Sequence, residues 1–513
     1  MTAGPPFDAT PLLRAYAALR LARLRAMDPA PTQERLLLRL VRRADRTRFG
    51  RDHGFAAIRT VADFQARVPL RRYEAFWDAY WRPAYPVLED LTWPGRIPYF
   101  ALSSGTTSGR NKFIPVTHEM MEENRAAATD LLCWHLANHP GSRVLGGLSF
   151  MLGGSTDLAE VAPGVRQGDL SGIAVAEVPF WARPWSWPPP ELALIADWDR
   201  KLAALAEAAP VPRIRALSGT PSWLLMLFER LAERHGRPPL PALELLVHGG
   251  VAWAPYRERV APWLPPGCAT REVYPASEGF FAIADRGDGE GMRLVLDGSC
   301  FFEFVPLEEL DAPRPTRHWA ATLETGVEYA IVVSSCAGLW AYVVGDTVRF
   351  LDRAPPRLLV TGRTSYTLSA FGEHLSGEEI ESALLTAARE TGLTVEEYSV
   401  GPVFDRAAGH HRWLVEAEPP PGEDGTAAGR RLAAALDAAL CAGNEDYERH
   451  RAARQLDPPE VTLLPHGAFA EWMRREGKLG GQHKVPRVVA DPERFAAMAA
   501  ALAPPGRAAR PRA

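Results

Sequence analysis

The sequence predicts an α/β protein: a large layered N-terminal domain followed by a small α+β domain. Short apolar runs bounded by Gly and Pro alternate with helical patterns in the first part of the chain. The pattern starts again after Thr361-Gly362-Arg363-Thr364, and 513 residues exceed what one core usually holds. We therefore expect domains at 1–363 and 364–500, with a disordered tail at 501–513.

The first part begins with helical patterns. Apolar positions at helical spacing predict helices over 9–27 and 32–46. Thr117 is expected to cap a long helix that runs through Leu131, and helices are also expected over 191–208 and 222–235. The runs expected to form strands are Leu243–Val247, Ile283 with Leu294–Leu296, Cys300–Val305, Tyr329–Ser334 and Leu358–Val360.

The second part opens with a helix that begins after Ser376, with acidic residues in its first turn. A long helix is expected over 427–441. Its predicted strands are Thr394–Val400, Trp413–Ala417 and Glu460–Leu464. His410-His411 has no companion ligands and is interpreted as a pair in a loop.

Composition and charge narrow the possible classes of protein. The chain is 47% hydrophobic and 23% charged, and 58 Lys+Arg against 62 Asp+Glu leave a net charge of −4. Such a balance gives no basic footprint for nucleic acid or an anionic membrane. We find no signal peptide and no run of eighteen apolar residues. Five scattered cysteines predict buried thiols in a cytoplasmic protein.

The most informative segment combines hydroxyls, two glycines and a lysine between two apolar runs. It reads Ser103-Ser104-Gly105-Thr106-Thr107-Ser108-Gly109-Arg110-Asn111-Lys112. Glycines let backbone amides approach a ligand closely, and the hydroxyls and ammonium donate to anionic oxygens, which predicts a phosphate cradle. It is not the P-loop of NTPases, because the glycines are closer together and no Ser or Thr follows the lysine. A polar hairpin loop is the alternative.

Three further clusters carry suitable chemistry but are weak when taken singly. Tyr274, Ser277 and Glu278 can stack on a base, bind a phosphate and hold Mg²⁺, or they can form an ordinary turn. Asp346, expected just past a strand end beside Gly345, can accept ribose hydroxyls, although Gly-Asp is also a common turn. Lys484 lies on a glycine-flanked loop that domain closure can deliver to a site, or it is a surface lysine.

In this order the clusters resemble the adenylate-forming (ANL) superfamily of acyl and aryl acid ligases, and more closely its Gretchen Hagen three branch. That branch contains the auxin-responsive acyl-acid amido synthetases and their bacterial relatives. The likeness covers residues 95 to 490. Besides the glycine-rich loop, its motifs are Ser218-Gly219-Thr220-Pro221-Ser222-Trp223, Tyr274-x-x-Ser277-Glu278, Phe302-Glu303-Phe304, Gly345-Asp346 and Lys484-Val485-Pro486-Arg487. The resemblance implies the ANL fold, with a small mobile C-terminal domain.

The resemblance also implies a role for each motif residue. ATP phosphates would be bound by Ser104, Gly105, Thr106, Thr107, Ser108, Gly109 and the catalytic Lys112. The adenine would lie against Tyr274 and the run His248, Gly249, Gly250 and Val251. Ser277 would position the α-phosphate, and Glu278 would hold Mg²⁺. Asp346 and Arg363 would contact the ribose, and Lys484 would come from the C-terminal domain to catalyse adenylation.

The implied reaction joins a small carboxylic acid to an amino acid or amine through an acyl-adenylate, with ATP consumed and pyrophosphate released. Val343 departs from the family, which often has arginine there. A thioester-forming acyl-CoA ligase would share every nucleotide motif, and a catalytically inactive nucleotide-binding relative is the third interpretation. Neither nucleic acid nor a membrane is expected as a partner. The sequence does not specify the acid, the acceptor or the oligomeric state.

The segment Pro179–Pro190 carries Trp181, Trp185 and Trp187 among several prolines. It forms either a rigid aromatic lid over an apolar acyl group or a loop that packs onto the core. Met120 and Met121 are likewise either pocket-lining or core residues.

Overall fold

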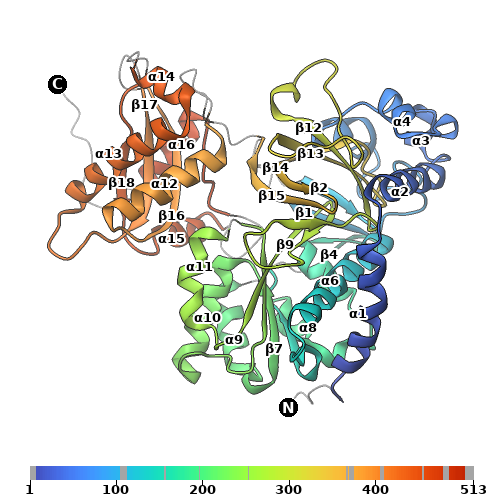
Figure 1. The fold of residues 1–513 in the computed structure, drawn as a ribbon, viewed down its shortest axis with the longest axis horizontal. Coiled ribbons are helices and arrows are strands. Elements are labelled where there is room, and N and C mark those ends of the chain that lie inside the picture. The colour runs from blue at the N-terminus through green and yellow to red at the C-terminus, as the bar shows by residue number, and fades with distance from the viewer. Residues whose placement is uncertain are drawn as a thin grey trace. The chain divides into compact units, whose positions relative to one another are not determined.

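The computed structural model divides the chain into two compact units, 1–360 with 480–482, and 361–479 with 483–513 (Figure 1). It describes residues 7–103, 112–154, 158–195, 197–251, 253–364, 368, 375–404, 409–452, 456–477 and 484–502. Among these residues every helix is too short or too polar to cross a bilayer.

The first unit begins with the two expected helices and contains most of the strands. Its helices are α1 (Thr10–Arg25), α2 (Pro29–Arg43), α3 (Arg48–Asp52), α4 (Val61–Arg67), α5 (Tyr73–Phe76), α6 (His118–Asn138), α7 (Leu170–Ala176), α8 (Pro190–Ala193), α9 (Trp198–Ala208), α10 (Pro221–His235) and α11 (Ala254–Val260). The strands up to the middle of the sheet are β1 (Tyr99–Ser103), β2 (Lys112–Val116), β3 (Leu148–Met151), β4 (Ala159–Ala162), β5 (Val165–Gly168), β6 (Ser186–Trp187), β7 (Ile214–Gly219), β8 (Leu245–Gly249) and β9 (Ala269–Ala276). The remaining strands are β10 (Gly279–Ile283), β11 (Met292–Leu294), β12 (Cys300–Pro306), β13 (Glu328–Ser335), β14 (Tyr342–Arg353) and β15 (Pro356–Arg363).

Local capping explains where two of these helices begin. The Thr117 hydroxyl accepts a hydrogen bond from the Met120 amide at 3.1 Å, so the predicted cap of α6 is confirmed. The prediction of one helix over 191–208 is wrong, because the helix is interrupted between α8 and α9. The Asp197 side chain accepts from the Arg200 amide at 2.7 Å and starts a new helix there.

Eleven strands form one mixed sheet in the order β12-β13-β14-β15-β11-β10-β9-β8-β7-β3-β6. The five neighbouring strands β9, β8, β7, β3 and β6 are parallel, whereas β10 runs antiparallel to β9. Helices α1 and α6 pack on one face of β7–β9 through a shared apolar cluster, and α9–α11 lie on the other face (Figure 1). The layered α/β fold predicted from the sequence is therefore confirmed.

A smaller four-stranded sheet has the order β2-β1-β5-β4. In it β1 and β2 are antiparallel, with Ser103 paired to Lys112 and Leu102 to Phe113. The glycine-rich segment therefore connects two neighbouring antiparallel strands. This topology differs from the strand–loop–helix arrangement of a P-loop.

The second unit is a three-stranded sheet with α12, α13 and α14 on one face and α15 and α16 on the other. Its elements are α12 (Gly377–Thr391), β16 (Val395–Val403), β17 (His410–Ala417), α13 (Gly425–Gly443), α14 (Glu445–Ala452), β18 (Glu460–Leu464), α15 (Ala468–Arg475) and α16 (Pro492–Leu502). Trp413 and Val415 of β17 pack with α12 and α13, whereas Leu414 packs with α15 and α16. The predicted start of α12 after Ser376 is confirmed, and Ser376 and Glu379 form a capping box there.

Two expectations based on local pattern are wrong. Asp346 lies inside β14, not past a strand end, because the strand continues through Gly345 at a φ of 98° to Arg353. His410 and His411 are buried residues of β17, not a loop pair, and His410 Nε2 lies 3.3 Å from a Glu460 carboxylate oxygen on β18. Polar residues on a buried strand weaken the alternation by which strands are recognised.

Candidate functional site

The carboxyl ends of β7, β8 and β9 meet at one edge of the sheet, because these strands are parallel and adjacent. In open α/β sheets, ligands bind outside this edge. Gly249–Val251 come at the end of β8, and Ser277 and Glu278 follow β9 directly. Two clusters that are well separated in the sequence are thereby brought to the same edge.

The glycines at the end of β8 are required by close packing against β9. Gly249 pairs with Val273, and a Cβ at Gly249 would lie 2.3 Å from the Val273 carbonyl oxygen. Gly250 has a φ of 86°, a conformation that side chains disfavour. The backbone at the end of β8 therefore packs directly against Val273, the residue that precedes Tyr274.

Tyr274 and Asp346 form a buried hydrogen-bonded pair. The Tyr274 hydroxyl donates to Asp346 Oδ2 at 2.6 Å, although β9 and β14 are far apart in the sheet order. Tyr274 also packs edge-on against Phe281, with ring centroids 5.0 Å apart. The hydrogen bond holds an aromatic ring beside a carboxylate. Such a ring can pack against a nucleotide base, and such a carboxylate can accept hydrogen bonds from ribose hydroxyls.

Ser277 and Glu278 form the two-residue turn between β9 and β10, since Ala276 pairs with Gly279. Both residues are buried, and the Cys300 thiol donates to the Glu278 carbonyl at 3.7 Å. Burial, followed by the charge of Glu278, holds the pKa of Tyr342 well above its usual value of 10.0. A buried carboxylate beside hydroxyl groups is an oxygen donor set that fits a hard divalent cation.

The phosphate-loop residues Ser104–Gly109 lie outside the described residues, but the strand that follows them is well defined. Lys112 is half-buried at the start of β2, with Nζ 5.7 Å from the Tyr73 ring centroid. The Tyr73 hydroxyl accepts from the Phe113 amide at 3.0 Å, and burial raises the pKa of Tyr73 to about 12. The neutral phenol thus anchors the first residues of β2 beside the lysine.

Arg363 and Lys484 belong to the second unit, which begins at Thr361 within β15. Arg363 is half-buried at the last position of β15, and Lys484 is exposed ahead of α16.

The sequence analysis named His248 but did not predict the contacts around it. His248 is fully buried, stacks on Trp253 with centroids 3.8 Å apart, and has Nε2 3.2 Å from Asp288 Oδ2. Against the effect of burial, hydrogen bonds from His248 and from Thr270 lower the pKa of Asp288. Burial and the charge of Asp288 raise the pKa of Glu272 to about 7. His248 pairs with Glu272 across β8 and β9, a register that no pattern in the sequence indicates.

The sequence analysis did not single out Lys201, since a lysine on an amphipathic helix is expected to be exposed. In the structure it is fully buried, and Nζ donates to the carbonyls of Gly153 at 3.0 Å and Ala193 at 2.6 Å. Burial lowers its pKa to about 8. Lys201 therefore fixes the backbone that follows β3 at the same sheet edge.

The tryptophan segment is largely structural. Trp187 is buried against Phe150 with ring centroids 4.3 Å apart, and Trp185 Nε1 donates to the Leu145 carbonyl at 3.0 Å. The Trp181 side chain, in contrast, is 63% exposed to solvent. Met120 and Met121 are core residues.

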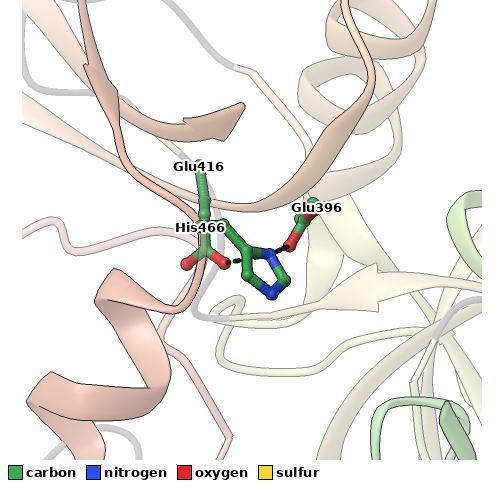
Figure 2. Close-up of side chains that lie close together, drawn as sticks. All are labelled: Glu396, Glu416 and His466. Carbon is green, nitrogen blue, oxygen red and sulfur yellow. Dashed lines mark hydrogen bonds and ion pairs between the residues drawn. The ribbon is translucent and has the colours of Figure 1, made fainter. Parts of the chain in front are cut away.

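Among the described residues, one group of side chains has donor atoms close enough to hold a metal: Glu396, Glu416 and His466 (Figure 2). His466 Nδ1 lies 2.5 Å from Glu396 Oε2. Both Glu416 oxygens already accept backbone amides, from Gly467 at 2.7 Å and from Phe469 at 3.1 Å. The group thus ties the start of α15 to β16 and β17, and we assign it a structural role.

Three domains described for one protein family match most of the chain. They are the GH3 family N-terminal domain over residues 20–215, the GH3 family central domain over 293–363 and the GH3 family C-terminal domain over 378–493. An indole-3-acetic acid-amido synthetase, GH3.3 of Arabidopsis thaliana, is 28% identical over 270 residues, which are 49% of this chain and 44% of that protein. The chain thus spans about half the length of this curated relative.

Solved structures share the fold over nearly the whole chain. The GH3.15 acyl acid amido synthetase superposes with a TM-score of 0.79 at 17% identity, covering 94% of this chain and 96% of that one. A 2-hydroxyisobutyryl-CoA ligase in the postadenylation state has a TM-score of 0.62 at 17% identity, covering 94% of each chain. These likenesses confirm the predicted ANL-type fold.

Proposed function

Because this chain belongs to the GH3 family, we propose that it is an adenylate-forming ligase that joins a small carboxylic acid to an amino acid or amine. The acid is first converted by ATP into an acyl-adenylate with release of pyrophosphate, and the amine then displaces AMP. A carboxylate needs this activation because its own leaving group would be oxide. The name of the relative GH3.3 supports an acid-to-amino-acid linkage.

The observation that carries the proposal is the buried Tyr274–Asp346 pair at 2.6 Å, beside the glycine turn that ends β8. The adenine would lie against Tyr274 and the backbone of Gly249–Val251. Asp346 would accept the ribose hydroxyls, with Arg363 as a further contact. The Tyr274 hydroxyl offsets part of the cost of burying the Asp346 carboxylate.

The reaction brings together two anions, the carboxylate and the α-phosphate. Lys484 would neutralise the charge that develops between them, Ser277 would orient the α-phosphate, and Lys112 with Ser104–Gly109 would hold the outer phosphates. The second unit would reorient between the two half-reactions, with a hinge at the end of β15. We propose domains at 1–363 and 364–500 on this basis.

Magnesium fits the donor set around Glu278, whose carboxylate is buried in a turn with Ser277. When bound there, Mg²⁺ would supply positive charge to the phosphate oxygens. We assign the reaction to the cytoplasm, because all five cysteines are free thiols.

The test is pyrophosphate release with Mg-ATP across aromatic, indolic and aliphatic acids, in the presence of pooled amino acids, coenzyme A or neither. Acid-dependent release that an amino acid accelerates, with an amide product identified by mass spectrometry, supports the proposal. Acceleration by coenzyme A alone would make the protein a thioester-forming ligase. ATP binding without release with any acid would point to a catalytically inactive relative.

A further inference from the structure

The chain that follows Lys484 is fixed to the edge of the three-stranded sheet. The Val400 amide donates to the Arg487 carbonyl at 2.8 Å, and the Val489 amide donates to the Val400 carbonyl at 2.9 Å. The Ser399 hydroxyl donates to the Pro486 carbonyl at 2.7 Å. This short parallel pairing with β16 begins three residues after the lysine.

The Arg487 side chain connects this pairing to two other elements of the second unit. Its Nε donates to Glu397 on β16 at 3.2 Å, and its NH1 donates to Glu381 on α12 at 3.1 Å. The guanidinium carbon lies 5.2 Å from the centroid of the Tyr398 ring. The side chains of Arg487, Glu381 and Glu397 are 16%, 20% and 19% exposed, so water screens these ion pairs only in part.

We propose that Arg487 is a positioning residue for Lys484, which rests on the adenylation role proposed above for that lysine. A lysine side chain is long and flexible, so its ammonium can occupy a defined place only if its backbone starts from a defined place. Arg487 fixes that starting point, because its planar fork reaches carboxylates on two elements while its carbonyl joins the sheet. A lysine at 487 has a single donor group and cannot make both contacts with the same geometry.

The test separates the two half-reactions in the full-length protein. Arg487→Ala and Arg487→Lys are assayed for acid-dependent pyrophosphate release and, separately, for aminolysis of an acyl-adenylate prepared in advance. We expect kcat for adenylation to fall about 10- to 100-fold in R487A and less in R487K, with KM for ATP and the aminolysis rate nearly unchanged. An equal fall in both half-reactions would overturn the proposal.

Arg451→Ala is the matched control, because Arg451 makes two 2.7 Å hydrogen bonds to Asp437 in the same unit. It should lower the melting temperature as R487A does while adenylation keeps its rate. The double variant R487A/K484A should be no slower than K484A alone, since both changes remove the same contribution. Full additivity of the two losses would overturn the positioning role. Normal adenylation by K484A would instead refute the proposed function of the lysine itself.

Discussion

The two units hold their proposed functional residues in opposite ways. In the first unit Tyr274, Ser277, Glu278 and Asp346 are buried, and the Tyr274–Asp346 pair is part of the sheet. In the second, Lys484 is exposed, and what is fixed is the chain that follows it. Binding groups of the first kind are ready before a ligand arrives, whereas a charge of the second kind can be brought in for one step and withdrawn. Substitution of the exposed Lys484 should therefore change the reaction rate and leave the stability of the protein unchanged, whereas substitutions of the buried residues can change both.

The largest effect should come from Lys484→Ala. Acid-dependent pyrophosphate release should fall about 100-fold or more, because one well-placed electrostatic donor contributes a few kcal/mol to a transition state. The lysine is exposed, so the free energy of unfolding in urea should hardly change. An undiminished rate would remove Lys484 from the mechanism.

Glu278→Gln should give the next largest effect. The neutral amide is a much weaker ligand for a hard cation, so we expect turnover to fall about 10- to 100-fold and the Mg²⁺ concentration for half-maximal rate to rise. Titrating Mg²⁺ in the pyrophosphate assay, after treatment with EDTA, measures both quantities. A wild-type Mg²⁺ dependence in this variant would mean that another group holds the metal.

Tyr274→Phe should have a smaller effect, confined to nucleotide binding. Removing the hydroxyl deprives Asp346 of one short hydrogen bond, which should weaken ATP binding about tenfold. Tyr447→Phe is the matched change in the second unit, since its hydroxyl donates to Asp437 at 2.9 Å. That variant should lose stability and keep its ATP affinity in isothermal titration calorimetry. Equal losses of affinity would show that the Tyr274 effect is not local.

The candidate site was predicted from the order of several clusters along the chain, with the glycine-rich loop as the one cluster that its own composition singled out. The Tyr274 to Glu278 turn and Asp346 are each weak signals alone, and the glycines at the end of β8 were assigned only through the family resemblance. Their order along the chain then indicated a shared nucleotide site. The structure adds a contact that no local pattern contains, the hydrogen bond between Tyr274 and Asp346 across the sheet.

Contacts that depend on tertiary burial could not be predicted. Lys201 looks like a surface lysine until the carbonyls of Gly153 and Ala193 surround it. Asp288 is polar in a segment rich in Gly and Asp, which indicates a loop, and only the fold brings it to His248. The interior of β14 was missed because Gly345 and Asp346 suggested a turn, whereas the strand continues past an irregularity there and pairs with β13 again at Thr347.

The smallest effect should be a pH-dependent gain in stability from Glu272→Gln at a half-buried position on β9 in the first unit. Burial, followed by the charge of Asp288, raises the pKa of Glu272 from 4.5 to about 7, while Arg257 opposes this shift. The folded state therefore favours the protonated carboxyl. Its contribution to stability is fully present below pH 4.5 and is lost as the pH rises to about 7.

Glutamine does not titrate, so the variant should become more stable than the wild type as the pH rises, by on the order of 1–3 kcal/mol at pH 8. Urea unfolding at pH 5 and pH 8 measures this difference. Glu258→Gln, at an exposed position on α11, is the control and should show the same small difference at both values. If the advantage of E272Q did not change with pH, the carboxyl would already be ionised without cost in the folded protein. The His248–Asp288 network would then not impose the negative field that the structure indicates.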